Sequence, residues 1–165
     1  MDNSLTIKKA FEASKRAYVP YSDCHVGAAI CLNDGTIIQG CNIENASYGL
    51  SNCAERSALF SLISQGYKKE EINHMVIVSD FKGDTRPCGA CRQVMLELLP
   101  VNAPIYMLNL DGSFAEKTIL ELEYEGEFII IANEDQVDLH GKHQEIYPTY
   151  ISSPVPLTQL YKEEL

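Results

Sequence analysis

The sequence predicts an α/β protein, a three-layer α/β/α sandwich built on a mixed five-stranded sheet. Near the start, two apolar runs flank Asn33-Asp34-Gly35, and Asp-Gly supplies the positive φ of a tight hairpin turn. Further on, helical segments 53–64 and 88–99 alternate with short apolar runs 74–79 and 103–110. This alternation is typical of parallel crossovers, which place helices on the faces of a sheet.

The individual elements are assigned from period, length and flanking residues. Residues 5–18 have the period of an amphipathic helix. Gly66 is a usual helix C-cap, and Ser51 or Asn52 can cap the start of helix 53–64. The predicted strands are 25–32, 36–43, 74–79, 103–110 and 113–117, and Thr118 with Glu121 has the capping-box spacing of a further short helix.

Length and composition indicate a single main domain. A chain of 165 residues, 45% of them hydrophobic, can bury one core and is short for two. We expect the domain to span residues 1–132. Residues 133–165 are polar and hold three prolines, so we expect a C-terminal extension that wraps the surface or is partly disordered.

Charge and hydropathy narrow the class of partner. A formal net charge of −10 provides no basic face for a nucleic-acid backbone. No run approaches the ~20 apolar residues that span a bilayer, and the N-terminus lacks the apolar stretch of a signal peptide. We therefore expect a cytoplasmic protein with neither a nucleic-acid nor a membrane partner, whose six cysteines are thiols.

Three of these cysteines have the context of metal ligands. Cys53 opens one predicted helix, and Cys88 and Cys91 open another. The free N–H groups and positive dipole of a helix N-terminus favour thiolates, which are the form that binds zinc. Three protein ligands leave the fourth tetrahedral position to a water molecule, as in catalytic zinc sites.

Charged residues beside these cysteines suggest the chemistry. Glu55 lies two residues after the predicted ligand Cys53, within reach of a bound water, and can act as a general acid/base. Arg56, and secondarily Arg92, could donate hydrogen bonds to the sulfurs, although both could also be ordinary helix-surface charges. A ligand two residues before a Glu, followed by Pro-Cys-x-x-Cys, is the pattern of zinc deaminases.

At this point the sequence resembles the cytidine deaminase family, in its small homotetrameric form with three cysteine ligands. The resemblance implies one Zn²⁺ per subunit and hydrolysis of cytidine and 2'-deoxycytidine to uridine and 2'-deoxyuridine, with release of ammonia, in pyrimidine salvage. It covers about the first 120 residues and rests on AYVPYS (17–22), VGAA (26–29), GCNIENASYGL (40–50), CAERSALF (53–60) and PCGACRQVM (87–95).

The same resemblance implies the substrate contacts. Asn42 and Glu44 match the residues that bind the ribose hydroxyls, and an amide and a carboxylate at alternate positions suit a diol. Tyr48 matches the residue that reaches the sugar end of a neighbouring subunit's site. Backbone groups of Ala54 are expected to read the base.

Two positions depart from the family. Cys24 stands where a phenylalanine usually packs against the pyrimidine, which suggests a roomier or differently shaped base pocket unless His25 or another ring fills the space. Near the C-terminal side, LELEYEGEF (120–128) lacks the family's proline. Phe128 is the first candidate, and Tyr124 the second, for the aromatic that closes the site from a neighbouring subunit.

Three other interpretations remain open. A deaminase of a modified or N4-substituted cytosine nucleoside, or of a nucleoside antibiotic, would account for Cys24. A non-catalytic zinc module would need a fourth ligand, for which Cys24 and His25 are the candidates, and would leave Glu55 without a role. A deaminase of bases within RNA or DNA would need a basic, aromatic-lined strip.

Overall fold

The computed structural model describes residues 3–81 and 85–124. The chain divides into two compact units, Met1–Leu122 and Glu123–Leu165, and every strand of the sheet belongs to the first. The helices are α1 (Ser4–Ser14), α2 (Ala54–Ser64), α3 (Gly89–Leu98) and the short α4 (Ile119–Tyr124), with 3-10 turns η1 (Tyr48–Leu50) and η2 (Lys69–Glu71). The strands are β1 (Val26–Leu32), β2 (Ile37–Cys41), β3 (Ile72–Ser79), β4 (Ile105–Asn109) and β5 (Phe114–Lys117).

These strands form the predicted mixed five-stranded sheet, in the order β2-β1-β3-β4-β5. The hairpin pairs β1 with β2 antiparallel, and Gly35 in its turn has φ 87°. β3 and β4, joined through α3, are parallel. The other two pairs are antiparallel.

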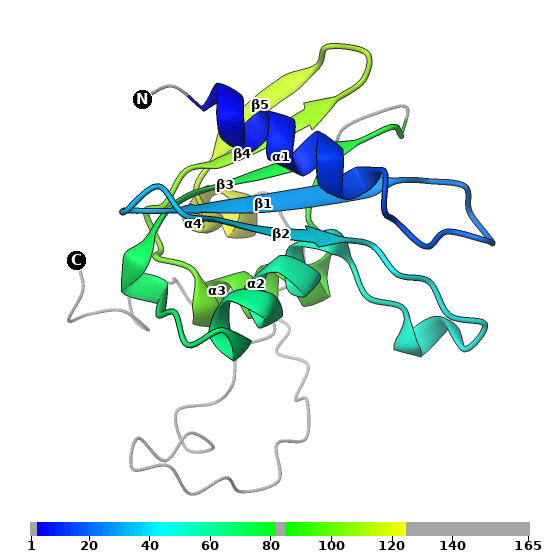
Figure 1. Cartoon of the computed structure of the whole chain (residues 1–165), viewed down its shortest axis with the longest axis horizontal. Coiled ribbons are helices and arrows are strands. Elements are labelled where there is room, and N and C mark those ends of the chain that lie inside the picture. The colour runs from blue at the N-terminus through cyan, green and yellow to red at the C-terminus, as the bar shows by residue number, and fades with distance from the viewer. Residues whose placement is uncertain (1–2, 82–84, 125–165) are drawn as a thin grey trace, which may run out of the picture. The chain divides into compact units, whose positions relative to one another are not determined.

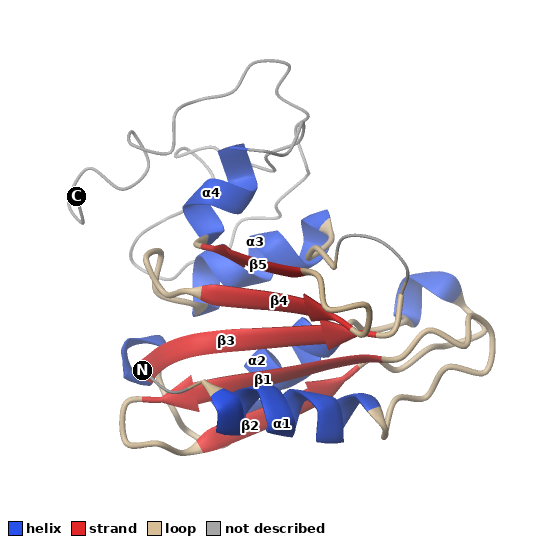
Figure 2. Ribbon diagram, turned by 90° about the horizontal axis from the view of Figure 1, so that it is seen from above, coloured by secondary structure: helices blue, strands red, loops and turns tan. Residues whose placement is uncertain are grey.

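Helices cover both faces of the sheet, which confirms the α/β/α sandwich. α1 packs on one face, and α2 and α3 pack on the other (Figure 1). In the view of Figure 2, α1 crosses in front of β1 and β2 while α2 and α3 lie behind the strands. The core between these layers is aliphatic, and its largest fully buried side chains include Ile30, Leu59, Leu62, Met75, Ile77, Met95, Leu99 and Ile105.

Glycines bring the helices directly onto the strands. A Cβ at Gly27 of β1 would lie 2.1 Å from the carbonyl oxygen of Ala10 in α1. A Cβ at Gly40 of β2 would lie 2.3 Å from the backbone nitrogen of Ala58 in α2. Ordinary side chains at either position would separate the layers.

Two local predictions were wrong. α1 ends at Ser14 rather than at residue 18, because the following backbone pairs with the segment after β2: Tyr18 N–H donates to the Asn42 carbonyl at 3.0 Å, and Glu44 N–H to the Tyr18 carbonyl at 2.8 Å. The N-cap of α2 is Cys53, rather than Ser51 or Asn52.

The boundary that the sequence predicts at residue 132 lies outside the described residues and stays a prediction. None of the helices that the structure describes between residues 3 and 124 has the length and apolar character needed to cross a membrane.

Candidate metal centre and active-site cavity

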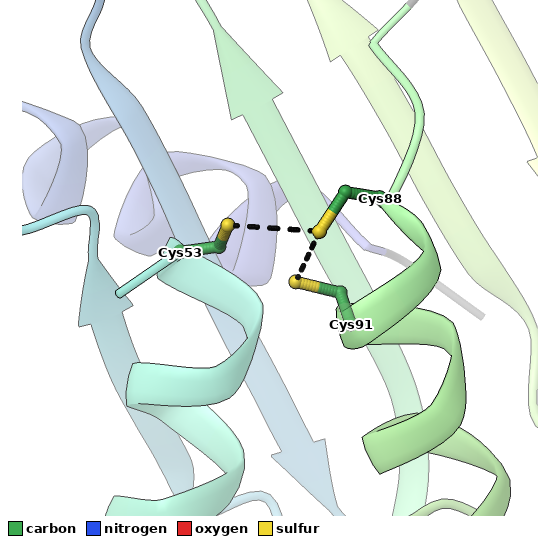
Figure 3. Close-up of side chains that lie close together, drawn as sticks. All are labelled: Cys53, Cys88 and Cys91. Carbon is green, nitrogen blue, oxygen red and sulfur yellow. Dashed lines mark hydrogen bonds between the residues drawn. The ribbon is translucent and has the colours of Figure 1, made fainter. Parts of the chain in front are cut away.

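Cys53, Cys88 and Cys91 meet between the N-termini of α2 and α3. Cys53 is the N-cap of α2, Cys88 is the N-cap of α3, and Cys91 follows in the first turn of α3. Figure 3 shows the three side chains turned toward one another from the two helices. The Sγ atoms of Cys53 and Cys88 are 3.9 Å apart, those of Cys88 and Cys91 are 3.5 Å apart, and all three lie within 4.8 Å of one another.

This spacing fits a zinc ion. Zinc bound tetrahedrally to thiolates at about 2.3 Å requires sulfurs about 3.8 Å apart. The three thiols also affect one another's pKa. Contact with Cys53 and Cys91 lowers the pKa of Cys88. Contact with Cys88 raises the pKa of Cys53, and contacts with Cys53 and Cys88 raise the pKa of Cys91. Three such close sulfurs ionise together only around a cation.

A buried carboxyl group lies beside the sulfurs. Glu55 occupies the first turn of α2 and is only 5% exposed. Burial is the main reason that its pKa is raised to about 7. A carboxyl group with a pKa near neutrality can both accept and donate a proton under physiological conditions.

Arg56 contacts the same cluster. Its Nη2 lies 3.7 Å from Cys53 Sγ and donates to the Ser51 carbonyl at 3.4 Å, while its buried Nε has no partner among the described residues. The guanidinium therefore lies beside the sulfurs, and its Nε–H is a further hydrogen-bond donor. Arg92 instead donates to the carbonyls of Pro87 at 3.0 Å and Leu122 at 2.9 Å, so it ties the start of α3 to α4.

A cavity of about 280 Å³ opens beside this centre, near the lower end of the range for small-molecule sites, about 300 Å³. Six of the residues that the sequence selected line its wall: Cys24, Asn42, Cys53, Ala54, Glu55 and Cys88. Residues that sequence reasoning missed complete the wall: Val26, Ile77, Ser79, Phe81, Thr85 and Arg86. Val26 begins the VGAA segment, whereas the other five carry no motif. The register of β3 and the course of the segment after it bring them to this edge of the sheet.

Asn42 and Glu44 hold the loop before β1. The Asn42 amide accepts the Val26 N–H at 2.8 Å and donates to the Cys24 carbonyl at 2.9 Å. Glu44 Oε2 accepts the N–H groups of Tyr21 at 3.0 Å and Ser22 at 3.2 Å. Hydrogen bonds from Ser22 and Tyr21 lower the pKa of Glu44, which keeps the carboxylate ionised. Each side chain retains further hydrogen-bonding capacity toward a ligand.

A buried polar network supports the other side of the cavity. Ser79 Oγ, at the end of β3, donates to Asn109 Oδ1 at 3.0 Å and lies 2.6 Å from Thr85 Oγ1. Thr85 also bonds Asn109, whose amide donates to Ser113 Oγ at 2.8 Å. The segment that leads into Cys88 is thereby fixed to the ends of β3 and β4.

The remaining predicted residues lie elsewhere. Tyr48, in η1, is 93% exposed and is not among the described residues that line the cavity. His25 bonds Asp80, Nδ1 to Oδ2 at 2.9 Å, and lines a different hollow beside α1. Phe128 and the side chain of Tyr124 lie outside the described residues.

An α/β/α sandwich with three thiols at facing helix starts, beside a buried carboxyl group, defines the zinc hydrolase class of site. The family model for the cytidine and deoxycytidylate deaminase zinc-binding region matches residues 1–107. The cytidine deaminase of Halalkalibacterium halodurans is 51% identical over 122 residues, which cover 74% of this chain and 91% of that protein. That of Sporosarcina psychrophila is 44% identical over 122 residues, or 74% and 88% of the two chains.

Solved structures of cytidine deaminases also resemble this chain. The crystal structure of cytidine deaminase from Burkholderia pseudomallei is 44% identical, has a TM-score of 0.71, and covers 74% of this chain and 96% of its own. The structure of the Mycobacterium tuberculosis cytidine deaminase is 34% identical with a TM-score of 0.61, over 74% and 94%. The chain therefore belongs to the cytidine deaminase family. Zinc is its cofactor.

Proposed function

We propose that the protein catalyses the hydrolytic deamination of cytidine and 2'-deoxycytidine to uridine and 2'-deoxyuridine, with release of ammonia. The observation that carries the proposal is the buried carboxyl group of Glu55, placed in a nucleoside-sized cavity next to three convergent sulfurs. Cys53, Cys88 and Cys91 would hold the zinc. A closed structural site would use a fourth protein ligand and would have no need of this carboxyl group.

The chemistry then divides between the metal and this chain's side chains. Zinc at an open site supplies a water molecule acidic enough to attack near neutral pH. Glu55 accepts the water's first proton and passes it to the ring nitrogen of the base. It then takes the remaining proton from the added hydroxyl group as the new carbonyl forms, and delivers that proton to the departing amine, which leaves as ammonia. Its pKa of about 7 suits this alternation. Arg56 offsets the negative charge of the sulfurs.

The nucleoside is oriented from both ends of the cavity. Asn42, which lines the wall, and Glu44, which lies two residues further along and is ionised, bind the ribose hydroxyls. The backbone of Ala54, the first residue of α2 and a wall residue, reads the base. Hydrogen bonds between these two side chains and the backbone before and at the start of β1 hold them in place before the substrate arrives.

We also propose a homotetramer in which neighbouring subunits complete each site. Large apolar side chains are exposed around the segment that follows β2 and along α2, which is unusual for a surface that stays in water. They include Ile43, Tyr48, Leu50, Phe60 and Ile63. Tyr48 is the proposed contact to a neighbour's sugar. The roles of Phe128 and of residues 133–165, and the cytoplasmic location, stay predictions.

Zinc content and cytidine turnover, measured on the same samples, test the proposal. Wild-type protein with one zinc per chain is expected to convert cytidine to uridine, followed by the loss of ultraviolet absorbance and the release of ammonia. Glu55→Ala should keep its zinc and lose turnover by at least ~100-fold, the lower end for a general acid/base. The control Glu116→Ala removes an exposed carboxylate of β5 and should match wild type. Wild-type turnover in zinc-loaded Glu55→Ala would contradict the mechanism.

A further inference from the structure

One wall of the cavity is formed by two chain segments that extend the β1–β3 ladder. The antiparallel register pairs Val26 with Ser79. The pairing continues one step beyond the strands, because Asp80 N–H donates to the His25 carbonyl at 3.2 Å. The His25 N–H donates to the Asp80 side chain at 2.8 Å. The next residues outward, Cys24 and Phe81, both line the cavity at the rim of the sheet, where a continued register would place them side by side.

The side chains of the two segments line different hollows, although the Cys24 thiol also lies within hydrogen-bonding reach of the Asp80 carboxylate. His25 and Asp80 bond each other and line the hollow on the α1 side. Cys24 and Phe81 line the cavity that holds Glu55. Cross-strand neighbours on one face have Cβ atoms about 4.5–5.5 Å apart, so a ring at either position covers the same wall. In this chain the large side chain belongs to Phe81.

The position and exposure of Phe81 suit a side chain that stacks against a flat ligand. Its ring is 58% exposed although it borders a cavity, and aromatic rings left open to water inside a concave site favour flat apolar ligands. The small thiol of Cys24 opposite leaves the face of the ring accessible. We propose that Phe81 is a specificity-determining residue that stacks against the pyrimidine ring, with Cys24 providing the space. This inference rests on the proposed cytosine-nucleoside function.

Kinetics of three variants test the assignment. Phe81→Ala should raise the KM for cytidine by about 5- to 150-fold, the range expected when one base–aromatic stack is lost, while kcat and zinc content stay near wild type. Phe81→Tyr keeps the ring and should stay close to wild type. Adding Cys24→Phe to Phe81→Ala should restore most of the lost affinity, because the register lets either position supply the ring. The matched control is Phe114→Ala, a ring of equal exposure on β5 outside this cavity.

Several results would overturn the assignment. An unchanged KM in Phe81→Ala would show that the ring does not contact the base. Loss of zinc in that variant would show that Phe81 only supports the segment that leads to Cys88. Failure of the added Cys24→Phe to recover affinity would also contradict it.

Binding separates this inference from the proposed function. Calorimetric titration of cytidine into zinc-loaded Glu55→Ala, with and without Phe81→Ala, measures how much the Phe81 ring contributes to the affinity for cytidine in the absence of turnover. If wild type does not deaminate cytidine but Phe81→Ala still weakens binding, the proposed function fails and Phe81 keeps its role. If turnover is normal and binding is unaffected by Phe81→Ala, only the role of Phe81 fails.

Discussion

Gly40→Ala should impair catalysis although Gly40 itself does not line the cavity. Gly40 lies in β2 under the first two turns of α2, and its added Cβ would lie 2.3 Å from Ala58 N and 2.5 Å from the carbonyl oxygen of Ala54. Both are backbone atoms, so no side chain can rotate away. Ordinary contact begins at 3.4 Å, so helix and strand must separate by about 1.1 Å.

That separation acts on the site whichever element moves. α2 carries Cys53 and Glu55, and β2 leads into Asn42. Zinc sites tolerate deviations of only about 0.2 Å in ligand distance, and misplacing reacting groups by 1 Å can cost about 100-fold in rate. We therefore expect kcat/KM to fall about 100-fold, the zinc affinity to fall, and the free energy of unfolding to decrease by about 1–3 kcal/mol, as is typical of overpacking.

The assay compares cytidine turnover, zinc content and urea unfolding in Gly40→Ala and in Glu116→Ala. Glu116 is an exposed residue of β5 outside the cavity wall, so Glu116→Ala should behave as wild type in all three measurements. A Gly40→Ala protein with wild-type kcat/KM and one zinc per chain would refute the close approach of α2 to β2 as the device that positions the site.

Three further predictions follow from the site and the core. Removing zinc with a chelator should abolish turnover and lower the Tm, and Zn²⁺ but not Mg²⁺ should restore both, because thiolates select the softer ion; restoration by Mg²⁺ would argue against the three-sulfur site. Burial lowers the pKa of His74, so the folded protein takes up this proton at a lower pH than the unfolded chain, in which a histidine binds a proton below pH ~6.5. The free energy of unfolding should therefore decrease as the pH is lowered below that value, and it should decrease by less in His74→Gln. The same pH dependence of the urea midpoint in wild type and in His74→Gln would contradict this. On N4-substituted cytidines, Cys24→Phe should lose more activity than on cytidine, whereas equal preference in both proteins would rule out a roomier base pocket.

Local signals made much of the fold predictable. Asp34-Gly35 fixes the hairpin because the turn needs a positive φ, which Gly35 has. Thr118 and Glu121 form the reciprocal capping-box bonds that open α4. Each of these signals depends on residues within four positions of one another. The Cys-Ala-Glu and Pro-Cys-x-x-Cys segments are equally local, so both helix starts were identifiable without knowing how they meet.

Contacts between residues far apart in the chain could not be predicted from the sequence. The end of α1 was misjudged because the backbone of Tyr18 bonds Asn42 and Glu44, more than 20 residues away. Phe81 and Thr85 reach the cavity only through the register of β3 and a hydrogen bond to Asn109. No period or spacing in the chain encodes those contacts.

The wrong choice of cap for α2 has a physical explanation in the metal centre. An N-cap side chain normally accepts a hydrogen bond from the first turn, and replacing Ser, Thr, Asp or Asn there costs about 1 kcal/mol. α2 and α3 both begin at a cysteine that makes no such bond, although Ser51 and Asn52 lie immediately before Cys53. The free N–H groups and dipoles of two helices are therefore left to act on the sulfurs, with the Arg56 guanidinium beside Cys53. Three thiolates around a divalent ion would carry a net negative charge, and these donors would offset it and so favour hydrolysis at the proposed centre. On this proposal, the two helices lose the stability of a side-chain cap at the two positions where the sulfurs are needed.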